Sequence, residues 1–76
     1  MITVKLYGLL RIESGVKQKQ LEARSVKEIL VFLADCGISP KDLDGCVILV
    51  NGNSASKRSK LTDGDTVVLM SPVAGG

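Results

Sequence analysis

The sequence predicts an α+β domain in which a mixed sheet of about five strands carries one main helix on one face. Three observations support this class. Several segments alternate or run apolar as strands do, one segment between them has helical spacing, and turn residues separate them all. The predicted order is ββαβββ, which is typical of a sheet covered on one side. At 76 residues the chain has the length of one small domain.

The first two strands are expected to form a hairpin. Residues 2–7 alternate between apolar and more polar side chains, which is the period of a half-buried strand. Residues 8–15 are interpreted as the connection of a wide hairpin. Residues 16–23 alternate weakly and are polar, so they predict a second strand at an edge of the sheet.

Ser25 is expected to begin the main helix. Residues 25–28 fit a capping box, in which the Ser25 side chain accepts from the Glu28 amide and the Glu28 side chain reaches back. Gly37 is placed to end the helix in a left-handed conformation, and Pro40 follows beyond that end. Apolar residues with the spacing i, i+3, i+4, i+7 predict the stripe that packs on the core, namely Val26, Ile29, Leu30 and Leu33.

The second half of the chain is expected to supply three more strands. Residues 47–50 are a continuous apolar run, which predicts a strand covered on both faces or nearly so. Asn51-Gly52 predicts a tight hairpin, because both central residues of such a turn need positive φ. A short return strand is expected near Ser54–Ser56. After a turn at residues 61–65, residues 66–71 predict the final strand.

The side chains offer little catalytic chemistry. The chain has no histidine, which excludes Ser–His and Cys–His dyads and the commonest metal ligand. The acidic residues at 42–44 and 63–65 are interpreted as parts of a solvated loop and a turn rather than as a metal site. Cys36 and Cys46 fit neither a zinc motif nor a redox Cys-x-x-Cys motif, so we expect two free thiols in a cytoplasmic protein.

The charge pattern argues against nucleic acid, and the short apolar runs argue against a membrane span. The net charge is only +2, and the basic residues are scattered apart from Lys57, Arg58 and Lys60. We expect these three to form a solvated loop that discourages edge strands from pairing. One Tyr and one Phe are too few for a platform on which bases stack. No signal peptide is visible, and no apolar run approaches the roughly 20 residues of a membrane span.

The end of the chain carries the most specific signal. The last six residues, SPVAGG, have no charged side chain, and the α-carboxylate of Gly76 is ionised at pH 7. Gly75 and Gly76 lack a Cβ, so such a tail can enter a narrow tunnel and present its carboxylate to a reactive centre. Pro72 stiffens the exit from the sheet. We therefore expect residues 1–71 to form the domain and 72–76 a flexible tail, the alternative being an ordinary frayed terminus.

With this tail and this order of elements, the chain resembles the ubiquitin-like β-grasp sulfur carriers of the MoaD/ThiS group, and most closely the small subunit of molybdopterin synthase. The resemblance runs the whole length. It is carried by residues 3–11 (TVKLYGLLR), Val50-Asn51, residues 61–67 (LTDGDTV) and the final Pro-Val-Ala-Gly-Gly. The thiamine-pathway carriers share the turn and the terminal glycines but more often lack the Pro-Val-Ala step. Ubiquitin has the same length and ending, but its penultimate residues are basic.

The resemblance implies a carrier that is not catalytic alone. A ubiquitin-activating-type enzyme (MoeB/ThiF-like) would adenylate the carboxylate of Gly76 with ATP, and a persulfide sulfur donor would displace AMP to leave a C-terminal thiocarboxylate. The carrier itself would bind no cofactor, because ATP is used by the partner. The sulfur would pass to a pterin precursor of the molybdenum or tungsten cofactor. Four residues would thread into the large subunit of the synthase (MoaE-like): Pro72, Val73, Ala74 and Gly75.

The resemblance also implies a partner surface on the sheet. Tyr7 and Met70 match two exposed apolar positions of the family, whereas Ser54 stands where a third, larger apolar residue is usual. Three other interpretations stay open at this point. They are a thiamine-pathway carrier, a ubiquitin-like modifier conjugated to lysines, and a plain binding module with an inert tail.

Overall fold

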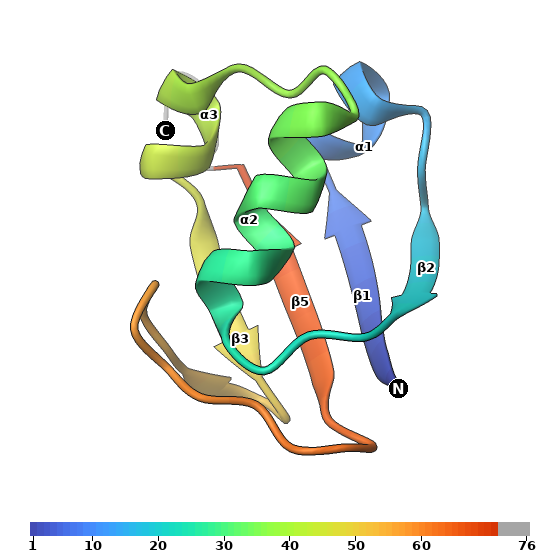
Figure 1. Ribbon diagram of the computed structural model, residues 1–76. Helices are drawn as coiled ribbons and strands as arrows, with labels where there is room; N and C mark the ends of the chain where they lie inside the picture. Colours follow the sequence, from blue (N-terminus) through green and yellow to red (C-terminus); the bar gives the residue numbers. More distant parts are fainter. Residues whose placement is uncertain (72–76) are drawn as a thin grey trace.

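A five-stranded mixed sheet is the frame of the computed structural model, which describes residues 1–71 (Figure 1). The strands are β1 (Ile2–Tyr7), β2 (Gln18–Leu21), β3 (Val47–Val50), β4 (Asn53–Ser54) and β5 (Thr66–Met70). Their spatial order is β2-β1-β5-β3-β4. The β1–β5 pair is parallel, and the β1–β2, β3–β4 and β3–β5 pairs are antiparallel. The predicted α+β class and the edge position of the second strand are confirmed.

In the described part of the chain the helices are α1 (Leu9–Ser14), α2 (Val26–Asp35) and α3 (Pro40–Asp44). The longest, α2, lies across one face of the sheet, while α1 and α3 sit near the end where β1 and β5 finish (Figure 1). Within residues 1–71, no helix has the length and apolar character that crossing a bilayer requires.

The core lies between α2 and the face of the sheet that it covers. Alternate residues of β1, β3 and β5 are buried there, and so is the whole predicted stripe of α2. Burying each such aliphatic side chain contributes about 1.5–3 kcal/mol, so this layer is the main source of stability. Its members are Ile2, Val4, Leu6, Ile48, Val67 and Leu69 from the strands, and Val26, Ile29, Leu30 and Leu33 from α2.

The predicted capping box at the start of α2 is wrong. Ser25 makes no side-chain cap bond, and the Glu28 carboxylate accepts from the amide of Arg24, not Ser25, at 3.3 Å. The loop after β4 takes over part of this role, because the carbonyl of Ser59 accepts from the Val26 amide at 3.0 Å. A tertiary contact thus satisfies one of the amides in the first turn of α2 that have no partner within the helix.

The predicted end of α2 is confirmed. Gly37 has φ +103°, and its amide donates to the Ala34 carbonyl at 3.0 Å. The Ile38 amide donates to the Leu33 carbonyl at 3.2 Å. These two bonds form a Schellman motif, which needs a residue with positive φ and so favours glycine.

Residues 8–15 contain a short helix, so the prediction of a plain hairpin connection is wrong. Leu10 of α1 is fully buried, and Gly15 ends the helix with φ +71°. The segment around Asp42 and Asp44 is also helical rather than a loop. Ser39 begins α3 by accepting from the Lys41 amide at 3.3 Å, and Pro40 occupies the first helical turn.

The predicted hairpin after β3 is confirmed. Asn51 and Gly52 have φ of +51° and +85°, as a tight turn between antiparallel strands requires. The return strand is β4, which begins at Asn53, slightly earlier than the predicted Ser54–Ser56.

Candidate functional site

The face of the sheet that α2 leaves uncovered carries an apolar row. Tyr7 of β1 pairs with Met70 of β5, and Met70 pairs with Val47 of β3. Paired residues point to the same face, about 4.8 Å apart from strand to strand. Tyr7 and Val47 are each 44% exposed. The structure therefore brings together Tyr7 and Met70, the two partner-surface residues implied by the resemblance, and adds Val47; we refer to these three as the apolar row.

A second row runs beside the apolar row on the same face. Lys5 pairs with Val68, Val68 with Leu49, and Leu49 with Ser54 at the edge of the sheet. Ser54 thus extends a row that contains two half-buried apolar residues. A larger apolar side chain at position 54 would enlarge that apolar surface.

The prediction that residues 47–50 are covered on both faces is wrong. Ile48 is buried and Val50 packs against the core, but Val47 and Leu49 lie on the uncovered face. An apolar run is equally compatible with an outer face that is kept apolar for another purpose. That outer set is the part of the candidate site that sequence reasoning missed.

The last described residue, Ser71, is fixed beside the start of α1. Its hydroxyl oxygen accepts a hydrogen bond from the Leu9 amide at 2.9 Å. Leu9 and Ile12 of α1 are also exposed apolar residues. The predicted tail residues lie outside the described residues, so their threading role and the reaction at the last one remain predictions: Pro72, Val73, Ala74, Gly75 and Gly76.

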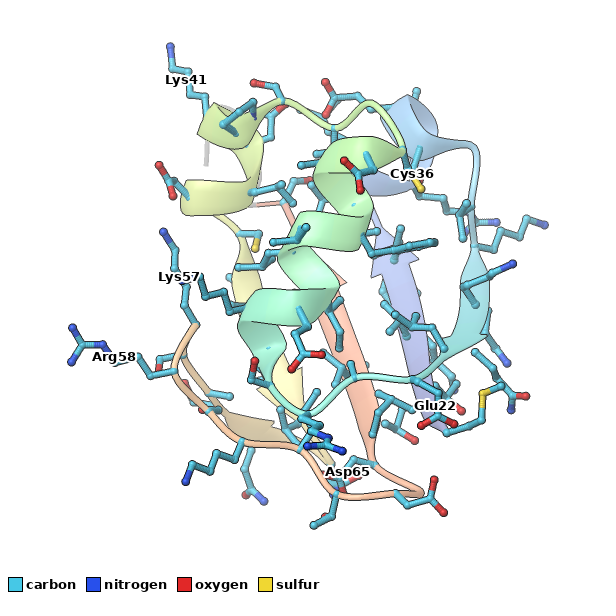
Figure 2. All side chains as sticks on the ribbon, in the orientation of Figure 1. Glu22, Cys36, Lys41, Lys57, Arg58 and Asp65 are labelled. Atoms are coloured by element: carbon cyan, nitrogen blue, oxygen red, sulfur yellow. The ribbon has the colours of Figure 1, made fainter. Side chains whose placement is uncertain are left out.

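The basic loop lies away from the apolar row, after β4. Lys57 forms an ion pair with Asp44 of α3, and both side chains are well exposed. Figure 2 shows Arg58 pointing away from the body of the domain. Such exposed pairs contribute little to stability, because water and salt screen them.

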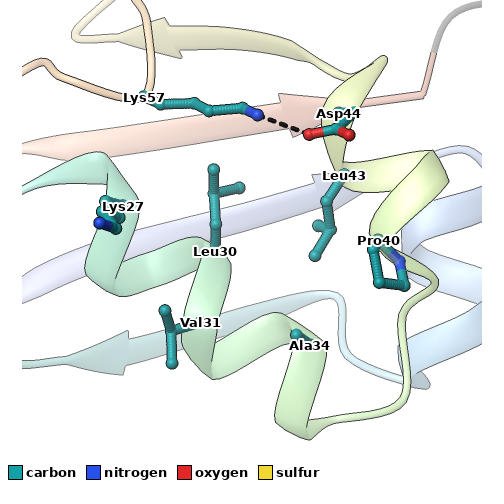
Figure 3. Close-up of a pocket in the computed structure, with 8 residues that line it drawn as sticks. All are labelled: Lys27, Leu30, Val31, Ala34, Pro40, Leu43, Asp44 and Lys57. Carbon is teal, nitrogen blue, oxygen red and sulfur yellow. Dashed lines mark hydrogen bonds and ion pairs between the residues drawn. The ribbon is translucent and has the colours of Figure 1, made fainter.

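A hollow of about 250 Å³ lies between α2 and α3, with the ion pair of Lys57 and Asp44 beside it (Figure 3). Val31 on its rim is 56% exposed. The volume lies below the roughly 300–1,000 Å³ of typical small-molecule sites. Across residues 1–71, no group of three or more His, Cys, Asp or Glu is placed to hold a metal ion.

The structure places Asp42 opposite Glu13 of α1, not with Asp44 as a pair. A side-chain hydrogen bond with Asp42, together with partial desolvation and the negative charge of Asp42, raises the pKa of Glu13. This contact joins two short helices that the sequence did not predict, so no local pattern could have indicated it.

Both cysteines are free and partly exposed, Cys36 at the end of α2 and Cys46 before β3. The Cys46 thiol donates to the carbonyl of Leu43 at 3.0 Å. Burial raises the pKa of the Cys46 thiol, which favours the uncharged and less nucleophilic form.

Comparison with known proteins places the chain in a family. The profile of the ThiS family matches residues 4–76. No curated protein matches the chain significantly.

Among solved structures the chain is similar to SAMP1 from Haloferax volcanii (TM-score 0.82, 22% identity, covering 99% of this chain and 98% of that chain). It is similar to the small archaeal modifier protein 1 from Methanosarcina acetivorans (TM-score 0.81, 26% identity, 99% and 95%). It is also similar to one chain of the complex of subunits 1 and 2 of the molybdopterin-converting factor from Helicobacter pylori 26695 (TM-score 0.70, 24% identity, 99% and 97%). These likenesses show that the fold is the predicted ubiquitin-like β-grasp. Because the family profile spans nearly the whole chain, the protein belongs to the ThiS family, with the fold of its sulfur carriers.

Proposed function

We propose that this protein is a sulfur carrier whose terminal Gly76 is adenylated and then converted to a thiocarboxylate, which donates sulfur in molybdopterin biosynthesis. The observation that carries the proposal is the junction at the end of β5. Met70 lies in the exposed apolar row, and the chain continues from Ser71 into a tail with two glycines and no charged side chain. In this proposal residues 1–71 are the body that partners hold, and residues 72–76 form the flexible tail that reacts.

The chemistry needs an activated carboxylate, because a free carboxylate is a poor electrophile. The Gly76 carboxylate would attack the α-phosphorus of ATP, releasing pyrophosphate and forming an acyl adenylate. A persulfide sulfur would then attack the carbonyl carbon and expel AMP. A second thiol would cleave the resulting acyl disulfide, which leaves the thiocarboxylate on the carrier and a disulfide on the donor. In this scheme the adenylating enzyme binds the ATP and supplies the catalytic groups, as suits a chain without histidine.

The apolar row supports a protein partner beside the tail. Exposed apolar patches of this kind mark interaction sites, and a few buried aromatic or aliphatic residues supply most of the affinity. In our proposal the partner is the large subunit of a molybdopterin synthase (MoaE-like), which covers Tyr7 and Met70 while it receives the tail. The Helicobacter pylori structure, a complex of two subunits, supports a partner of that kind. The two free cysteines suit a reducing cytoplasm, where we place the carrier.

Two alternatives start from the same activated carboxylate. The likeness to small archaeal modifier proteins favours a modifier that is joined to lysines of target proteins. The match to the ThiS family profile favours a thiamine-pathway carrier. Both would keep the tail and the apolar row, so the receiving partner distinguishes the three functions.

The deciding experiment measures sulfur transfer to Gly76 in vitro and molybdopterin production in a deletion strain. The purified chain is incubated with an adenylating enzyme, ATP and a persulfide donor, and its intact mass is expected to show one oxygen exchanged for sulfur. A variant lacking Gly76 should melt at the same temperature but should neither gain sulfur nor restore molybdopterin to a deletion strain.

Three results would count against the proposal. Molybdopterin production by the variant lacking Gly76 would overturn the carrier role. A thiamine requirement of the deletion strain would favour the thiamine pathway. Recovery of the chain linked to lysines, with no effect on either cofactor, would favour the modifier.

A further inference from the structure

We infer that Ser71 is a positioning residue, whose hydroxyl holds the point and direction at which the reactive tail leaves the domain. The inference rests on the proposed function and adds to it a specific contact. It joins two segments 62 residues apart in the sequence, since the Leu9 amide donates to the Ser71 hydroxyl at 2.9 Å.

The conformation of Gly8, and its lack of a side chain, leave room for this contact. Its φ of +67° lies in the left-handed region that favours glycine. A Cβ added at Gly8 would lie 2.3 Å from the hydroxyl oxygen of Ser71 and 3.6 Å from its Cβ. Both the backbone conformation and the space for Ser71 therefore require glycine at this position.

The same bond completes the start of α1. Leu9 is the first residue of that helix, and its amide has no partner within the helix. A residue at the N-cap position usually supplies the acceptor, but Gly8 has no side chain to offer. Ser71, at the other end of the described chain, supplies this acceptor. The same hydrogen bond therefore caps α1 and holds the residue at which the chain leaves β5.

Ser71 also lies where the backbone pairing of β5 stops. The last pair between β1 and β5 is Tyr7 with Met70. Beyond this pair, the side-chain bond of Ser71 to the Leu9 amide ties the end of β5 to α1 as well. The proline that follows restricts Ser71 to extended conformations, so the hydroxyl contact and the next residue act on the same backbone.

A fixed starting point matters because the tail is short. Five residues span at most about 17 Å when fully extended, which limits how far from Ser71 the reacting phosphorus can lie. Ordering one more backbone residue on binding costs conformational entropy. Loss of the contact should therefore raise the KM for the carrier about 5- to 30-fold in the adenylation step, with little change in kcat.

The test uses three variants at one position. Ser71→Ala removes the hydroxyl. Ser71→Thr and Ser71→Val introduce side chains of nearly the same shape, but only the threonine carries a hydroxyl. In the free protein, Ser71→Ala and Ser71→Val should speed hydrogen exchange at the Leu9 amide and lower the NMR order parameter at residue 71. Ser71→Thr should resemble the wild type in both.

The second readout is pyrophosphate release by a ubiquitin-activating-type enzyme with ATP, measured against carrier concentration. We expect the higher KM for Ser71→Ala and Ser71→Val and rescue by Ser71→Thr, while all three variants stay fully folded at the assay temperature and lose no more stability than one helix cap supplies. A wild-type KM for Ser71→Val, despite faster exchange at Leu9, would overturn the positioning role and leave the carrier function standing. Absence of adenylation of the wild-type chain would overturn the proposed function and this inference with it.

Discussion

The side-chain amide of Asn51 donates a hydrogen bond to the Asp65 carboxylate at 2.9 Å and so ties the turn after β3 to the start of β5. The carbonyl oxygen of the same Asn51 side chain accepts from the Thr66 amide at 2.9 Å. Asn51 also has positive φ, which asparagine tolerates better than most residues. One residue therefore satisfies a turn and links it to the strand in the middle of the sheet.

Replacement of Asn51 should separate these two roles. Asn51→Ala loses the hydrogen bonds and keeps a Cβ in the left-handed region, which costs about 1–2 kcal/mol for the backbone relative to glycine. Asn51→Gly loses the same bonds but keeps the backbone unstrained, so it should be the less destabilised variant. Urea unfolding of both measures the difference. Equal stability of the two variants would show that φ is not a factor.

The stability of the protein should depend on Asp65 in acid. The Thr62 amide, and then the Asn51 amide, donate to this carboxylate and lower its pKa. Because the folded pKa lies below the unfolded one, the ionised group stabilises the fold above its ordinary pKa of about 3.9. That contribution is lost as the pH falls through the lowered value. The difference in melting temperature between wild type and Asp65→Asn should shrink below about pH 4; a constant difference would contradict this account.

Leu10 should matter far more than its neighbour Ile12 on the same short helix. Leu10 is completely buried, whereas Ile12 is 76% exposed. Leu10→Ala removes packing and leaves a cavity, which costs about 2–5 kcal/mol. Ile12→Ala serves as the matched control and should change stability by less than about 0.5 kcal/mol. A similar loss for both would mean that α1 does not pack as described.

Binding of a large synthase subunit should depend on the apolar row. Tyr7→Ala and Met70→Ala are each expected to weaken binding about tenfold or more, as buried interface residues do. Val31→Ala is the control, because Val31 is also exposed and apolar but lies on α2. Titration calorimetry of the four proteins measures the effect. Equal loss with Val31→Ala would remove the uncovered sheet face from the interface.

A larger apolar side chain at position 54, in the row beside the apolar row, gives a second test of the partner surface. Ser54→Leu places an apolar side chain beside Leu49, with which residue 54 pairs. The same titration should show tighter binding, because the added side chain becomes buried against the partner. Unchanged affinity would show that the partner does not reach the β4 edge.

Cys46 should react slowly with iodoacetamide while the protein is folded. Burial raises the pKa of its thiol, and the thiolate is the reactive form. Unfolding in urea removes the burial, so alkylation at pH 8 followed by mass spectrometry should be clearly faster in the denatured chain. Equal rates would indicate that the thiol is already solvated in the folded state.

The sequence predicts the long elements well because each repeats its signal several times. β1 shows three alternations, and α2 shows four apolar residues at helical spacing. The short helices α1 and α3 each bury one residue, Leu10 and Leu43, and a single apolar residue has no period. Their existence depends on tertiary contacts that no local pattern contains.

The candidate site is predictable only in part for the same reason. Alternation places Tyr7 on the outer face, but residues 47–50 are apolar throughout, so only the strand pairing shows that Val47 faces outward. The contact between Ser71 and Leu9 spans the chain and depends on Gly8, which lies between the predicted strand β1 and the helix α1 that the sequence did not predict. The sequence identifies the tail by its composition, whereas the hydrogen bond that holds the residue before the tail is visible only in the structure.

The parallel pairing of β1 with β5 has a mechanical consequence. The two strands run in the same direction at the centre of the sheet, so the start of one and the finish of the other lie at opposite ends of the pair. A force that pulls the start of β1 away from the finish of β5 would load all their hydrogen bonds in shear at once, rather than unzip them one by one. A partner that pulls on the tail while it holds the rest of the domain would therefore need a large force to separate β5 from β1.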